Sequence, residues 1–117
     1  MKIRIDVAGG PVTATLDNNE SSQDFVKQLP MTLTLEDYAS TEKISDLPKP
    51  LSTQGAPAGF TPSSGDITFY APWGNLAIFH KGFKYSSGLI KLGRIDSGLE
   101  VLARPGPIKV TIILVSE

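Results

Sequence analysis

The sequence predicts an all-β protein, a closed barrel of about seven to eight strands with two short helices. Short segments that alternate apolar and polar residues, as strands with one buried face do, recur along the chain. No segment predicts a helix long enough to cover the face of a sheet. The chain has 117 residues, 40% hydrophobic and 20% charged, which suits one domain spanning residues 1–117 with a single core. Such strands bury their apolar faces and lose their exposed edges by closing into a barrel.

The N-terminal part of the chain supplies three of the predicted strands and one helix. Residues 3–7 and 12–16 alternate apolar and polar side chains, and Gly9-Gly10 between them suits a hairpin turn. Residues 18–30 begin with several possible N-cap side chains, continue with an apolar stripe and end at a proline, which predicts a short helix. Residues 31–38 alternate again and predict the third strand.

Residues 46–65 predict a long irregular connection. They contain four of the nine prolines and few residues suited to a core. Loops of this length in a compact domain are usually functional or packed as a lid. The connection is therefore a candidate for one side of a binding site.

The C-terminal part predicts four further strands and the second helix. Residues 67–70 and 76–79 flank a turn, and residues 89–95 and 108–115 are apolar enough for strands. Residues 99–103 predict one or two helical turns.

Gly93 lies inside the predicted strand 89–95, where a glycine weakens the strand because it has no side chain to pack. In a closed barrel, a glycine at such a position lets the strand bend or lets another chain pass close. We therefore expect Gly93 to occupy a bent or crowded part of the barrel.

The composition excludes several classes of site. The absence of cysteine excludes disulfides, thiolate metal sites and cysteine nucleophiles, and a single histidine, His80, excludes a histidine-cluster metal site. A net charge of -1 gives no bias towards nucleic acid or membranes, and no phosphate loop, nucleotide fingerprint or zinc spacing is present. We expect no cofactor, no metal, no nucleic-acid or membrane partner, and a cytoplasmic location.

An aromatic cluster is the main candidate for a binding site. Aromatic side chains recur within sixteen residues near the C-terminal half, and together with Phe60 they could line an apolar pocket: Tyr70, Trp73, Phe79, Phe83 and Tyr85. The alternative is packing in the core and in turns, which suits Phe79 best. His80 lies among them, but acid–base work would need a partner that the sequence does not place.

Two charged groupings are weaker candidates. His80, Lys81, Lys84, Lys91 and Arg94 lie in a stretch without acidic residues and could form an anion-binding edge, although a solvated strand face is the favoured explanation. Asp66 and Asp96 each adjoin a turn and could act as a carboxylate pair if they were adjacent. Aspartates at turns are, however, commonly caps of backbone amides.

The glycine strand also carries a family resemblance. Residues 92–99, LGRIDSGL, resemble the cyclophilin segment that reads Phe-Gly-Lys-Val, two residues, Gly-Met. Residues 65–79 are similar to the two cyclophilin strands beside the Asn-Gly turn, and residues 108–112 to the closing strand. The segments LPMTLTLEDY, YAPWGNLAIFHK and GLIKLGRIDSG resemble the small bacterial and archaeal cyclophilin-like proteins of about this length. The resemblance covers essentially the whole chain and implies a cyclophilin-like barrel.

The resemblance also implies which residues a cyclophilin-type site would need. Cyclophilins isomerise prolyl bonds with an arginine on an early strand, and this chain has no arginine in residues 31–60. Near residues 81–89, where the family has a tryptophan and a histidine beside its proline pocket, this chain has other side chains: Phe83, Tyr85 and Leu89.

We therefore expect a binding module with an aromatic cleft for a small molecule or an extended, proline-containing peptide. The predicted ligand-binding residues are Phe60, Tyr70, Trp73, His80, Phe83 and Tyr85. A divergent peptidyl-prolyl isomerase is the alternative, and a structural or partner-binding subunit is a third possibility. The sequence predicts no oligomeric state.

Overall fold

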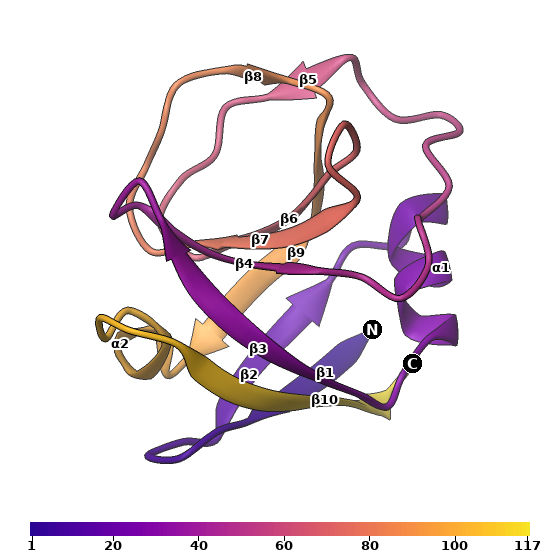
Figure 1. The fold of residues 1–117 in the computed structure, drawn as a ribbon. Coiled ribbons are helices and arrows are strands. Elements are labelled where there is room, and N and C mark those ends of the chain that lie inside the picture. Colours follow the sequence, from indigo (N-terminus) through magenta and orange to yellow (C-terminus); the bar gives the residue numbers. More distant parts are fainter.

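The computed structural model describes all 117 residues and confirms the predicted all-β class. Eight antiparallel strands close into one barrel in the order β1–β10–β3–β4–β7–β6–β9–β2 (Figure 1). The barrel strands are β1 (Lys2–Asp6), β2 (Val12–Leu16), β3 (Met31–Tyr38), β4 (Glu42–Asp46), β6 (Asp66–Tyr70), β7 (Asn75–Phe79), β9 (Leu89–Ser97) and β10 (Ile108–Ser116). A separate two-stranded sheet and two helices complete the fold: β5 (Gly59–Phe60), β8 (Ser86–Ser87), α1 (Glu20–Lys27) and α2 (Leu99–Leu102).

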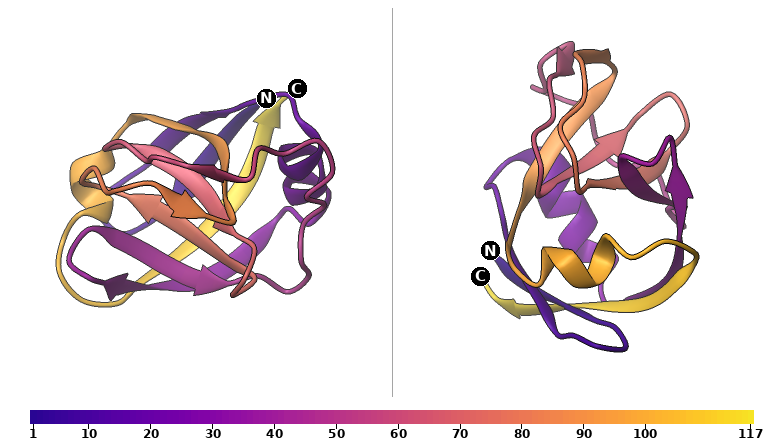
Figure 2. Two further views of the ribbon diagram at one scale, coloured as in Figure 1. Left: turned by 90° about the horizontal axis from the view of Figure 1, so that it is seen from above. Right: turned by 90° about the vertical axis from the view of Figure 1, so that its left-hand side faces the viewer.

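The hydrophobic core fills the inside of the barrel because the alternating strands place every second side chain there. Ile3 and Ile5 of β1 and Val110 and Ile112 of β10 are each at most 2% exposed. The two helices lie at opposite ends of the barrel (Figure 2). α1 contributes Phe25 to the core, and α2 contributes the equally buried Leu102. Neither helix is long and apolar enough to cross a membrane.

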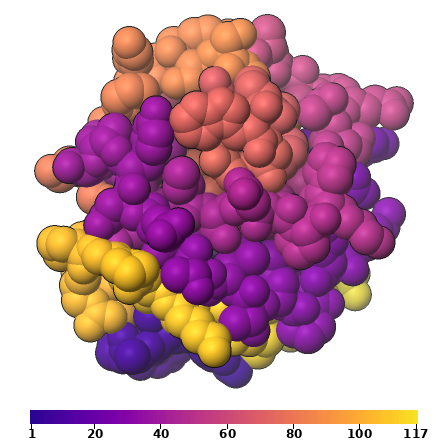
Figure 3. All heavy atoms as spheres, in the orientation of Figure 1, coloured from indigo at the N-terminus to yellow at the C-terminus, as the bar shows by residue number.

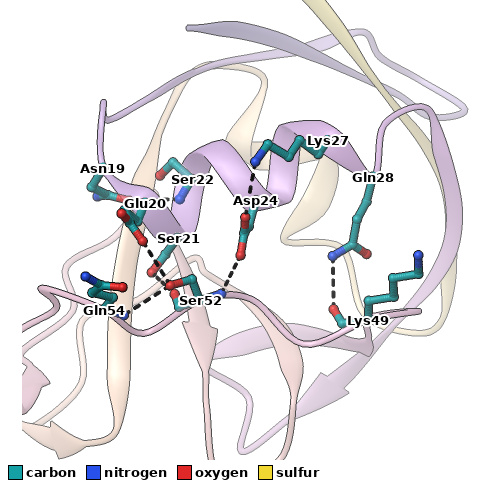
Figure 4. Close-up of polar contacts among 10 residues, drawn as sticks. All are labelled: Asn19, Glu20, Ser21, Ser22, Asp24, Lys27, Gln28, Lys49, Ser52 and Gln54. Carbon is teal, nitrogen blue, oxygen red and sulfur yellow. Dashed lines mark hydrogen bonds and ion pairs between the residues drawn. The ribbon is translucent and has the colours of Figure 1, made fainter.

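The connection predicted over residues 46–65 is long, as expected, and part of it is fixed to α1 (Figure 4). The backbone N–H of Ser52 donates to Asp24 Oδ2 at 2.7 Å, and Ser21 Oγ donates to the Ser52 carbonyl at 2.5 Å. Gln28 Nε2 donates to the Lys49 carbonyl at 3.0 Å. The later part of this connection contains β5, which the sequence analysis did not predict, because strands of two residues leave no detectable alternation.

Gly93 lies in a crowded strand, which confirms the expectation for this residue. It pairs with Leu16 of β2 on one side and with Ile67 of β6 on the other, where the register between β6 and β9 shifts. A Cβ at this position would overlap the Thr15 carbonyl oxygen and lie 2.7 Å from the Leu16 Cα. The glycine therefore permits a close approach of β2 next to a bulge in the barrel wall.

Strand β4 was missed by the sequence analysis, and its burial pattern explains why. Its inward side chain Lys43 is 0% exposed, its outward neighbour Glu42 is also buried, and the outward Ile44 is partly buried. Lys43 Nζ lies 2.7 Å from Asp37 Oδ1 and donates to the Gly106 carbonyl at 2.5 Å, so the buried charge is paired. A short strand with a buried lysine does not show the apolar alternation that predicts a strand.

Candidate functional site

The outer face of the barrel carries a second, smaller apolar cluster. Ala77 and Phe79 of β7 and Leu89 of β9 are at most 3% exposed, and Ile44, Phe60 and Tyr70 pack against them. Outward side chains of a barrel normally face solvent. Here they are covered by two excursions of the chain, residues 55–63 and 80–88, which pair through β5 and β8 (Figure 1). This cluster forms the floor of the candidate site.

A pocket of about 170 Å³ opens above this cluster. It is lined by residues from β3, β4, the β6–β7 region, the excursion after β7 and the start of β9: Tyr38, Glu42, Ile44, Tyr70, Trp73, Asn75, Phe79, Phe83, Ser86 and Leu89. Figure 3 shows the β6–β7 turn at the surface, below residues 80–88 and to the right of the β3–β4 turn. The pocket therefore lies where three separate surface turns meet.

Trp73 forms one wall of the pocket at the tip of the β6–β7 turn. Its ring lies edge-to-face with Tyr38, at a centroid distance of 5.4 Å and an angle of 85°, and with Tyr70, at 5.3 Å and 78°. Trp73 is nevertheless 55% exposed, which agrees with a rim position rather than a core position. Edge-to-face contacts hold the indole in place while leaving much of its surface open to a ligand.

Another part of the wall is formed by Phe83, whose ring stacks on Phe79. Their rings are stacked at a centroid distance of 6.4 Å and an angle of 25°. Phe79 is buried beneath, whereas Phe83 is 38% exposed. Lys84 Nζ lies 5.9 Å from the centroid of the Phe83 ring, a cation–π distance.

Two buried polar side chains lie among these rings. Glu42 is 8% exposed and Asn75 is 3% exposed, and both line the pocket. Asn75 Oδ1 has no hydrogen-bond partner. Glu42 takes part in none of the five ion pairs of the structure. Burial raises the pKa of Glu42 to about 7, although the neighbouring Thr41 hydroxyl opposes this shift. The pocket therefore holds a carboxyl group that titrates near neutral pH.

Three of the predicted site residues come together in this pocket: Tyr70, Trp73 and Phe83. The other three do not line it. Phe60 lines a second cavity of about 260 Å³ beside the start of α1, and Leu89 lines both cavities. A role in ligand binding stays a prediction for all six of the residues that the sequence analysis named.

Tyr85 and His80 lie outside the linings of both cavities. Tyr85 is 57% exposed, and its hydroxyl lies close to Gly59 of β5. His80 donates its backbone N–H to the Thr41 carbonyl at 3.0 Å, and burial, followed by the charge of Lys81, lowers the pKa of its ring.

The two charged groupings, the aspartate pair and the basic stretch, do not form a site in the structure. Asp66 Oδ1 lies 3.4 Å from Arg94 Nη1, whereas Asp96 accepts from Thr15 Oγ1 at 2.7 Å and lies 3.4 Å from Lys2 Nζ. Each aspartate thus has its own partners, as expected of residues that stabilise turns and strand ends. Lys81 and Lys84 are exposed, as expected of a solvated face.

Sequence reasoning missed six residues that line the pocket: Tyr38, Glu42, Ile44, Asn75, Ser86 and Leu89. Tyr38 and Glu42 are opposite each other on β3 and β4, and Glu42 is opposite Phe79 on β7. These contacts depend on the pairing of β4 with β7, which are far apart in the chain. No local pattern indicates that pairing, so no signal in the sequence could have placed Glu42 beside the aromatic cluster.

Comparison with known proteins supports the fold. The model of the Cyclophilin-like family matches residues 5–113. Among solved structures, the chain is similar to the solution structure of a hypothetical protein from Archaeoglobus fulgidus, with a TM-score of 0.68 and 17% identity. That alignment covers 98% of this chain and 95% of the archaeal chain. No curated protein matches the sequence. At this identity, the structural likeness supports the barrel architecture alone.

Proposed function

Because this chain belongs to the Cyclophilin-like family and has an aromatic pocket on the outside of its barrel, we propose that it is a binding module. Its aromatic pocket accepts a small molecule or the side chains of an extended, proline-containing peptide. The protein acts by holding this ligand rather than by transforming it. The proposal concerns the pocket between Trp73 and Phe83.

The observation that supports this proposal is the exposure of the aromatic wall. Tyr38, Trp73 and Phe83 are between 38% and 55% exposed, although each carries a large apolar surface. Aromatic side chains gathered at a concave surface are typical of ligand sites, because rigid rings provide contact area at a low cost in conformational entropy. Proline rings pack well against such surfaces, which favours proline-containing peptides among possible ligands.

We also propose that the protein lacks the usual prolyl isomerase chemistry. None of its three arginines lines the pocket. Arg4 Nε lies 2.7 Å from Asp6 Oδ1, Arg94 donates to the Ser64 carbonyl, and Arg104 donates to the Ala8 carbonyl. The arginine that stabilises the twisted peptide in cyclophilins thus has no counterpart among these pocket residues.

A paired mutant titration tests the binding proposal. Trp73 is the only tryptophan, so its fluorescence reports directly on the pocket. Proline-containing tetrapeptides and a set of single-ring fragments are titrated against wild type, Phe83→Ala and Tyr85→Ala. The two variants each remove an exposed aromatic ring from the same excursion, but only Phe83 lines the pocket.

We expect at least one probe to bind and Phe83→Ala to weaken it about tenfold, as expected for losing one aromatic contact. Tyr85→Ala should leave the affinity within about twofold of wild type. An equal loss of affinity in both variants would show that the probe binds outside this pocket. A protease-coupled assay on the same peptides tests the second proposal, since a rate enhancement lost in Phe83→Ala would establish isomerase activity there.

A further inference from the structure

We propose that the ligand of this pocket carries an organic ammonium group, which lies against Glu42 within the ring of aromatic side chains. The inference rests on the proposed function and specifies the chemical class of its ligand. It is carried by three features of the pocket: an unpaired buried carboxyl group, walls made of aromatic faces and edges, and the absence of any basic side chain.

The carboxyl group of Glu42 differs from the other buried carboxyl group of the protein. Asp66 is 2% exposed and lies 3.4 Å from Arg94 Nη1, so its charge has a partner inside the protein. Glu42 is 8% exposed and has no basic partner. Buried carboxyl groups are normally paired because desolvation of an isolated charge is costly. A cationic ligand would supply the missing partner.

The aromatic walls favour the same sign of charge. The face of an aromatic ring is electronegative and attracts cations, most strongly for tryptophan. The Trp73 ring stands at 85° to Tyr38 and at 78° to Tyr70, so the rings present surfaces in different directions around the pocket. Lys84 Nζ lies 5.9 Å from the centroid of the Phe83 ring, so a ring of this wall already takes part in one cation–π contact.

The other polar groups of the pocket discriminate against anions. The lining contains no lysine, arginine or histidine, and Asn75 offers an unpartnered oxygen that can accept a hydrogen bond. A carboxylate or phosphate would meet the charge of Glu42 without any compensating donor of positive charge. An ammonium group can donate to Glu42 and to Asn75.

The size of the pocket limits the ligand. An apolar cavity of about 150 Å³ is large enough to hold a benzene ring. The present pocket of about 170 Å³ therefore suits one ring or a short branched alkyl group that bears the ammonium. Benzylammonium has this size, and benzyl alcohol is its neutral counterpart.

The titratable groups around Glu42 determine how binding should depend on pH. Lys43, the next residue on β4, is inward-facing and paired with Asp37 of β3. Lys81 and Lys84, in the excursion after β7, are exposed, and the phenols of Tyr38 and Tyr70 lie in the wall. His80, directly after β7, has a lowered pKa and gains a positive charge only on acidification. At low pH, Glu42 loses its negative charge and His80 gains a positive one, and each change weakens the binding of a cation.

The test compares benzylammonium with benzyl alcohol by nuclear magnetic resonance titration at pH 5 and pH 8, in wild type and in Glu42→Gln. Glutamine keeps the size of the side chain and removes its charge, so the variant should fold. At pH 8 we expect benzylammonium to bind wild type at least about tenfold more tightly than benzyl alcohol. The preference should disappear in Glu42→Gln.

On lowering the pH to 5, the affinity of wild type for benzylammonium should fall by at least about tenfold. The limit is about 100-fold, because two units below a pKa of about 7 only ~1% of the carboxyl groups are ionised. Benzyl alcohol should show little change. A pH dependence that persists in Glu42→Gln would assign the effect to His80 and overturn the proposed role of Glu42.

Equal binding of the two probes to wild type at pH 8 would overturn the inference and leave the binding proposal in place. Binding of neither probe would also overturn it, whereas the binding proposal would then be decided by the peptide and fragment titration with Phe83→Ala.

Discussion

Substitution of Gly93 by alanine tests whether the barrel closes as described. Gly93 lies between Leu16 of β2 and Ile67 of β6, next to the register shift of β9. A Cβ there would overlap the Thr15 carbonyl oxygen and lie 2.7 Å from the Leu16 Cα. Both of these are backbone atoms in a strand held by hydrogen bonds on its two sides, so a side-chain rotation cannot relieve the overlap.

The expected cost follows from this geometry. Replacing glycine by alanine at an unstrained site stabilises a protein by about 0.4–1 kcal/mol, because the unfolded chain loses conformational freedom. Overpacking a well-filled site costs about 1–3 kcal/mol, and a clash with backbone belongs at the upper end. We expect Gly93→Ala to lower the free energy of unfolding by about 2 kcal/mol, and hence the Tm by roughly 8 °C.

The assay is denaturant unfolding followed by circular dichroism, with Gly82→Ala as a matched control. A Cβ on Gly82 would lie 3.6 Å from the Pro62 carbonyl oxygen, an ordinary contact, so this variant should stay within about 0.5 kcal/mol of wild type. Unchanged stability of Gly93→Ala, or a loss equal to that of the control, would refute the close approach of β2 and β9.

Three further predictions concern the pocket and the buried lysine. Trp73→Ala should cost only about 1–2 kcal/mol in urea unfolding, because the indole is 55% exposed, whereas truncating a buried aromatic costs about 3–5 kcal/mol. The pKa of Glu42 is raised to about 7, so the stability that its protonated form contributes is present at pH 4 and is lost as the pH rises through 7. The free energy of unfolding of Glu42→Gln should therefore be higher than that of wild type by about 2–3 kcal/mol at pH 8 but not at pH 4, as measured by thermal unfolding across that range. Asp37→Ala should lower the free energy of unfolding by about 3 kcal/mol, because it leaves Lys43 buried without its carboxylate partner. Lys43→Met should leave the free energy of unfolding nearly unchanged, and the urea midpoints of the two variants distinguish these outcomes.

The sequence predicted the barrel well where a single face of a strand is buried. Residues 3–7, 12–16 and 31–38 alternate, and the structure confirms a strand in each segment. The crowded position of Gly93 was also predictable, because few causes place a glycine inside a strand. In these cases the feature that predicts the structure lies within a single strand.

The site was less predictable because two of its determinants are not local. Glu42 enters the pocket through the pairing of β4 with β7, and the outward face is covered by residues 55–63 and 80–88. The sequence grouped the aromatic residues correctly around Tyr70, Trp73 and Phe83, since they are close in the chain. It could not separate them from Phe60, which lines the neighbouring cavity, because that separation depends on how distant segments of the chain pack against one another.

Intermolecular nuclear Overhauser effects from a bound probe provide the most direct test of the aromatic pocket as a ligand site. The probe is the tightest-binding fragment or proline-containing peptide of the titration. We predict contacts from its protons to the rings of Trp73, Phe79 and Phe83, which line the pocket. Contacts to Phe60 and Ala56 instead would place the ligand in the cavity beside α1 and would contradict the account.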